Sequence, residues 1–85
     1  MKDWQKTSIA LHLEHLTDRI NIWENNLATG SIDPTYAVGC SANILEATAE
    51  RNGIIYTLSV FGYEPHFSEN NIHSTKCEIV EIKKD

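Results

Sequence analysis

The hydrophobic positions in the first third of the chain recur with the spacing of a coiled-coil helix. Because an α-helix has about 3.6 residues per turn, apolar residues separated by alternating gaps of 4 and 3 form one narrow seam. This seam predicts a helix over residues 4–28 that packs lengthwise against a second helix, with Asp3 as its N-cap. The seam consists of Ile9, Leu13, Leu16, Ile20, Trp23 and Leu27.

The residues after this helix predict a tight connection to a second one. Gly30 suits the left-handed position that ends many helices. Asp33 followed by Pro34 is the favoured order for an N-cap and the first helical residue. So short a connection predicts that the second helix runs antiparallel to the first.

The end of the second helix can be interpreted in two ways. Asn52 and Gly53 could terminate it, and residues 54–61 are rich enough in β-branched and aromatic side chains to form a strand, which would give an α+β fold. Two apolar stripes, however, keep their helical spacing across Gly53, and this favours one helix over 34–61, with Gly62 as its C′ residue. The first stripe contains Cys40, Ile44, Ala47, Arg51, Ile54, Leu58 and Phe61, and the second stripe contains Val38, Ala42, Leu45, Ala49, Asn52, Tyr56 and Val60.

The C-terminal tail, residues 63–85, has a different character. It contains Pro65 and several turn-forming residues, and residues 77–82 have β character. We predict a short strand there, paired with residues 64–68 as a hairpin. The predicted fold is therefore mainly α: a single domain over 1–85, with an antiparallel helical hairpin at 3–62 and a tail carrying a loop and a short strand or hairpin.

Helix two is apolar on two sides, and helix one can cover only one of them. The second stripe must then meet either a second copy of the chain or the C-terminal tail, and we expect a homodimer. Helix one also carries a weaker seam opposite its main one, in which Trp4 is the expected exposed aromatic contact. The predicted interface residues are Val38, Ala42, Leu45, Ala49, Tyr56, Trp4, Leu11 and Ile22.

Composition narrows the possible partners. The 85-residue chain has a formal net charge of −5, which disfavours direct nucleic-acid binding because that binding relies on Lys and Arg at phosphates. No run of about 18 apolar residues predicts a membrane span, and no export signal is apparent. We therefore expect a cytoplasmic protein in which Cys40 and Cys77 are reduced thiols.

Candidate chemistry is sparse. His12 and His15 could share a helical face, but no second ligand pair stands at zinc spacing, so metal binding is the least favoured function. Glu14 and Asp18 lie four residues apart, which predicts a solvated helical face rather than an acid–base pair. The chain has no nucleophile motif or phosphate-binding loop, and we expect neither an enzyme nor a bound cofactor.

Residues 36–39 and 53–63, together with the turn at 30–34, are similar to the second helix of small helical-hairpin proteins encoded by bacteriophages and prophages. The likeness covers about residues 9–63 and supplies no functional residues. It implies an accessory protein that acts by binding a host or phage partner. The favoured function is a non-enzymatic interaction module; the alternatives are an acidic inhibitor of a host defence or nucleic-acid-handling protein, and a small metal-binding protein.

Overall fold

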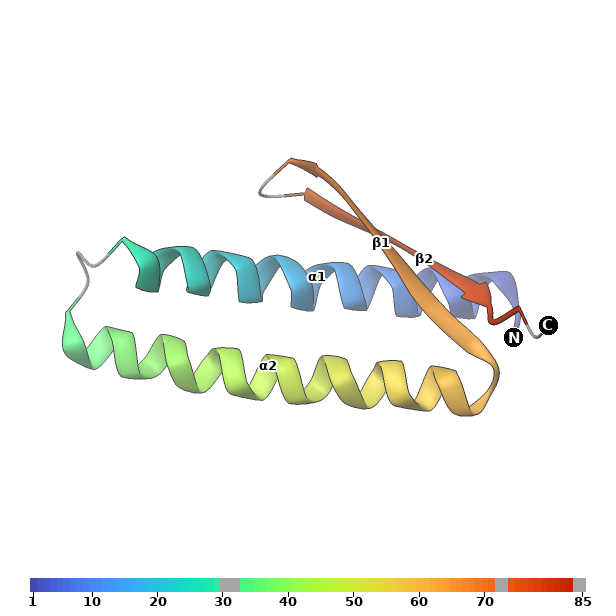
Figure 1. Ribbon diagram of the computed structural model, residues 1–85, viewed down its shortest axis with the longest axis horizontal. Coiled ribbons are helices and arrows are strands. Elements are labelled where there is room, and N and C mark those ends of the chain that lie inside the picture. The colour runs from blue at the N-terminus through green and yellow to red at the C-terminus, as the bar shows by residue number, and fades with distance from the viewer. Residues whose placement is uncertain (30–32, 72–73, 84–85) are drawn as a thin grey trace.

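Two long antiparallel helices lie side by side, and a β-hairpin crosses one face of the pair near both chain ends (Figure 1). The computed structural model describes residues 1–29, 33–71 and 74–83, and the molecule measures 48 × 25 × 24 Å. In chain order the elements are α1 (Asp3–Ala28), α2 (Pro34–Val60), β1 (Tyr63–Asn71) and β2 (Ser74–Glu81). The predicted helical hairpin with a strand hairpin after it is confirmed.

Helix α1 begins one residue earlier than predicted. Asp3 is not the N-cap but the first helical residue, and Lys2 occupies the cap position. The side chain of Gln5 explains the shift, because its Oε1 accepts the Lys2 backbone N–H over 2.9 Å. Asp3 then places a negative charge in the first turn, where the helix dipole stabilises it.

Helix α2 has the predicted caps. Asp33 Oδ1 accepts the Thr35 backbone N–H over 2.7 Å, and Gly62 has the positive φ of +85° that favours glycine. The predicted cap at Gly30 lies outside the described residues. The helix continues through Gly53, so the alternative of a strand at 54–61 is wrong. Burial of Leu58 and half-burial of Ile54 against α1 and the hairpin offset the weak helix propensity of this segment.

The predicted seam of α1 forms the centre of the molecule. Its six members are all buried or half-buried, and Leu13 is completely shielded from solvent. Of the first stripe of α2, only Phe61 departs from the prediction, being 71% exposed. Phe61 is the C-cap residue, with φ −90° and ψ 3°, and lies just beyond the last residue of α2.

The hairpin is longer than predicted and packs through one face. β1 and β2 pair antiparallel, with Phe67 opposite Cys77 and Pro65 opposite Ile79. These four side chains are buried or half-buried, and Phe67, Cys77 and Ile79 pack on the core formed by Leu13 and its neighbours. In contrast, Glu64, His66, Ser68, Lys76 and Glu78 are all exposed.

Candidate interaction surface

Strand β2 is held on helix α1 by two carboxylates. Glu14 Oε1 accepts the Cys77 backbone N–H over 2.8 Å, and Asp18 Oδ1 accepts the Thr75 N–H over 3.1 Å. A spacing of four residues on a helix, about 6 Å, matches two residues on a strand, so the two hydrogen bonds run in step. Both acids are half-buried, and the prediction that they form a solvated face is wrong.

The Cys77 thiol faces the helices in an environment that keeps it neutral. Burial, and then the nearby charge of Glu14, raise its pKa to about 11, and Arg51 offsets part of this increase. The Arg51 guanidinium itself lies 4.9 Å from the centre of the Phe67 ring, a cation–π contact between α2 and β1. A thiol with this pKa carries little thiolate at neutral pH and is a poor nucleophile or metal ligand.

Two of the four histidines, His12 and His66, take part in surface pairs, and among the described residues no such pair is seen for the exposed His15. His12 Nε2 lies 2.9 Å from Glu50 Oε1 and links α1 to α2, while His66 Nε2 lies 3.0 Å from Glu64 Oε1 on the hairpin. Over residues 1–29, 33–71 and 74–83 no group of three His, Cys, Asp or Glu side chains is placed to hold a metal ion. His73 lies outside the described residues.

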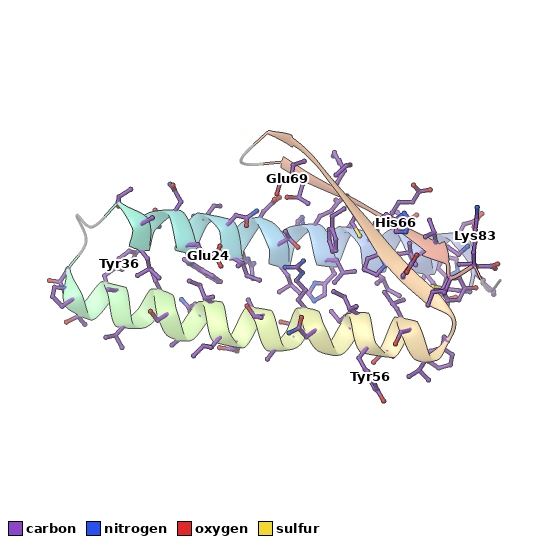
Figure 2. The ribbon with its side chains drawn as sticks, viewed as in Figure 1. Glu24, Tyr36, Tyr56, His66, Glu69 and Lys83 are labelled. Atoms are coloured by element: carbon purple, nitrogen blue, oxygen red, sulfur yellow. The ribbon has the colours of Figure 1, made fainter. Side chains whose placement is uncertain are left out.

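The second stripe of α2 is exposed along the whole helix. Exposure reaches 71% at Val38, 73% at Leu45, 71% at Tyr56 and 63% at Val60. Figure 2 shows Tyr56 pointing away from both α1 and the hairpin. The alternative in which the C-terminal tail covers this stripe is therefore wrong, because the described part of the tail, residues 63–71 and 74–83, packs on another side of the molecule. Ala42, Ala49 and Asn52 are exposed as well.

The other three predicted interface residues lie elsewhere. Trp4, Leu11 and Ile22 are 64%, 50% and 45% exposed on the side of α1 that faces away from its buried seam. Since the second stripe occupies the side of α2 remote from α1, the eight predicted residues fall on two separate surfaces. The structure brings Val38, Ala42, Leu45, Ala49 and Tyr56 together on one helix and leaves the α1 group apart.

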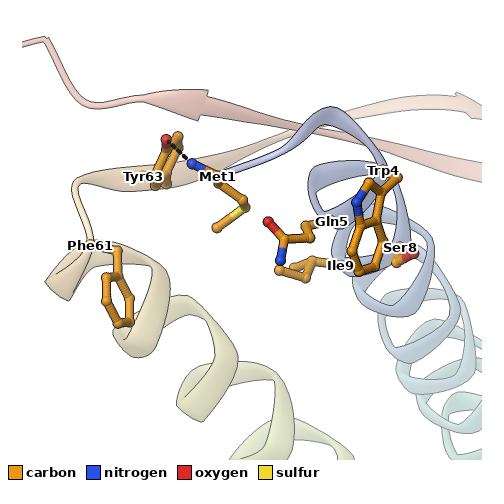
Figure 3. Close-up of a pocket in the computed structure, with 7 residues that line it drawn as sticks. All are labelled: Met1, Trp4, Gln5, Ser8, Ile9, Phe61 and Tyr63. Atoms are coloured by element: carbon orange, nitrogen blue, oxygen red, sulfur yellow. Dashed lines mark hydrogen bonds between the residues drawn. The ribbon is translucent and has the colours of Figure 1, made fainter.

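An apolar hollow that the sequence did not reveal opens where the chain ends meet. It has a volume of about 600 Å³ and lies between the start of α1 and the end of α2. Phe61 and Trp4 stand at its two sides, and the Met1 amine donates to the Tyr63 hydroxyl over 3.1 Å at its edge (Figure 3). Phe61 belongs to the first apolar stripe of α2, but no local sequence pattern shows that it meets the start of α1 here. The lining residues are Met1, Trp4, Gln5, Ser8, Ile9, Phe61 and Tyr63.

Comparison with protein-family models, curated proteins and solved structures found no match to this chain. Neither described helix has the length and apolar character that crossing a membrane requires.

Proposed function

We propose that this protein is a non-enzymatic helical interaction module that self-associates through the second stripe of α2. One observation carries the proposal: the stripe stays exposed over the full helix, although α1 and the hairpin cover other sides of the molecule. Contiguous apolar surface of this kind on a small protein marks an interaction site. Removal of such surface from water contributes about 25 cal/mol per Å², from which the entropic cost of association is subtracted.

The titratable groups support a binding role over catalysis. Glu14 and Asp18 are engaged by backbone amides of β2, and His12 is paired with Glu50. The Cys77 thiol is held neutral by burial, as its pKa of about 11 shows. None of these groups lines the apolar hollow beside Phe61, whose lining residues with polar groups are Met1, Trp4, Gln5, Ser8 and Tyr63.

The alternative of an acidic inhibitor receives less support from the structure. Mimicry of a nucleic acid needs carboxylates that are free to meet basic residues of the target. Glu14 and Asp18, two acids one helical turn apart on α1, instead accept hydrogen bonds from the hairpin. A phage or mobile-element accessory role in a host cytoplasm remains part of our proposal, and it rests on the resemblance of residues 9–63 alone.

Sedimentation tests the proposal directly. At micromolar concentration the native protein should sediment at twice its 9.6 kDa chain mass. Ala49→Glu places a charge in the middle of the stripe, where dimer formation would desolvate it at a cost of several kcal/mol, and should yield a folded monomer.

Asn43→Glu is the matched control. Asn43 is exposed on α2 but projects away from the second stripe, so the same added charge should leave the dimer intact. A native protein that sediments at the mass of one chain at these concentrations would overturn the proposal. If Ala49→Glu and Asn43→Glu both sediment as dimers, the dimer contact lies outside the second stripe.

A further inference from the structure

Five members of the second stripe are placed symmetrically about Ala49, and one symmetric pair joins a small side chain with a large one. Ala42 and Tyr56 stand seven residues before and after Ala49, and Val38 and Val60 stand eleven residues before and after it. Consider an antiparallel helix pair with a two-fold axis at Ala49. A residue that stands a given number of positions before Ala49 then faces the residue of the other copy that stands the same number of positions after Ala49. The small Ala42 then receives the large Tyr56, and the two Ala49 methyl groups meet on the axis.

Charge is compatible with this arrangement. The 27 residues of α2 contain three charged side chains, Glu46, Glu50 and Arg51, and none belongs to the second stripe. Glu50 is paired with His12, and Arg51 faces Phe67. Glu46 is the charged residue nearest to the second stripe, and it stands three residues before Ala49. Its counterpart across the axis is therefore Asn52, three residues after Ala49, which carries no charge. None of the three charged side chains of α2 therefore stands directly opposite another charged side chain in the reversed copy.

The exposed area is adequate for a stable dimer. Val38, Leu45, Tyr56 and Val60 are each 63–73% exposed. With the two alanines they offer at most about 600 Å² per copy, or about 1,200 Å² in total, which is the lower limit for a stable specific interface. The alanines also permit the short distance between helix axes, about 8 Å, at which the larger side chains can interdigitate.

From these observations we propose that the partner of the second stripe is α2 of a second copy, packed antiparallel with the two-fold axis at Ala49. This inference rests on the proposed self-association and specifies its geometry. For helices paired in this way the axis runs perpendicular to the helical layer. The dimer therefore has four helices side by side, and both β-hairpins lie on the same face. Parallel packing would place the hairpins on opposite faces.

Cysteine cross-linking between two differently tagged variants distinguishes the two packings. Ala42→Cys mixed with Tyr56→Cys should form a mixed disulfide on mild oxidation, which shifts the band from 9.6 kDa to twice that mass. Ala49→Cys should cross-link with itself for the same reason. Each replaced side chain is exposed, so the fold should survive, and circular dichroism of each variant checks this.

The controls separate this inference from the proposed function. The native protein, whose Cys40 is buried and Cys77 half-buried, should form no cross-link under the same oxidation. Ala42→Cys that cross-links with itself, or a dimer that none of these cysteines cross-links, would overturn the antiparallel arrangement while leaving self-association intact. A monomer in sedimentation would overturn both.

Discussion

The backbone N–H of Cys77 donates to the carboxylate of Glu14 over 2.8 Å, so a helix side chain occupies the place of a third strand at this edge of the hairpin. One helical turn further on, Asp18 does the same for Thr75. A two-stranded hairpin is marginal in water by itself. Here its strand β2 is bound to α1 through both its buried side chains and its backbone.

Loss of the Glu14 carboxylate should destabilise the fold. Glu14→Ala leaves the half-buried Cys77 amide without its acceptor, which costs about 1–3 kcal/mol in the free energy of unfolding. Urea denaturation measures this loss. Glu14→Gln keeps an acceptor oxygen and should lose less, and Glu24→Ala, on the exposed surface of α1, should change the free energy by under ~0.5 kcal/mol. Equal losses for Glu14→Ala and Glu24→Ala would show that the hydrogen bond does not stabilise the fold.

The seam of α1 should dominate stability. Leu16 is 3% exposed and packs with Ile20 and Ala47, so Leu16→Ala should cost ~2–5 kcal/mol. Asn25→Ala, on the exposed side of the same helix, should cost under ~0.5 kcal/mol. Thermal and urea unfolding of the two variants give the comparison, and a small loss for Leu16→Ala would remove this residue from the core.

Two glycines should respond in opposite directions to replacement by alanine. Gly53 is helical and a Cβ there meets nothing within 4 Å, so Gly53→Ala should raise the free energy of unfolding by about 0.5–1 kcal/mol. Gly62 has φ +85°, and Gly62→Ala should lower it by about 1–2 kcal/mol. Denaturation midpoints provide the measurement. Destabilisation by Gly53→Ala would argue against a continuous helix α2.

The Cys77 thiol should resist alkylation in the folded protein. Its pKa of about 11, against an ordinary 9.0, lowers the thiolate fraction at pH 8 by roughly a hundredfold. Iodoacetamide labelling with mass-spectrometric localisation should therefore be about that much slower at Cys77 in buffer than in urea. The folded state favours the neutral Cys77 thiol. The contribution of this preference to the free energy of unfolding is therefore complete below pH 9 and is lost as the pH rises from 9 to 11. Stability of Cys77→Ala should lack this dependence on pH between 9 and 11. Rapid labelling of Cys77 in the native protein would contradict its burial.

The helices could be predicted from the sequence because their signals are local and periodic. Neighbouring residues of the seam from Ile9 to Leu27 are about one helical turn apart. The cap at Asp33 and the helix end at Gly62 likewise depend on residues within one or two turns. The second stripe was predictable as apolar for the same reason, and its exposure followed once α1 was assigned to the other side. The strand alternative at 54–61 failed because propensity was outweighed by burial of Leu58 against α1 and the hairpin.

The contacts between distant segments could not be predicted. Glu14 and Cys77 are 63 residues apart, and nothing in the spacing of Glu14 and Asp18 distinguishes acids that bind a strand edge from acids in solvent. The cation–π contact of Arg51 with Phe67 and the hollow beside Phe61 have the same origin. Each depends on where the hairpin lies across the helices, and that placement is set by packing rather than by a sequence pattern.

Because the carboxylate contacts to the hairpin end at Asp18, α2 is the main described element that packs on the remaining third of α1. Trp23 and Ile44 are half-buried there, beneath no described strand. Protection of backbone amides from exchange should therefore fall along α1 toward Ala28, and along α2 toward Pro34. Local opening should therefore be most frequent at Ala28 of α1 and Pro34 of α2, and least frequent where the hairpin packs on the helices.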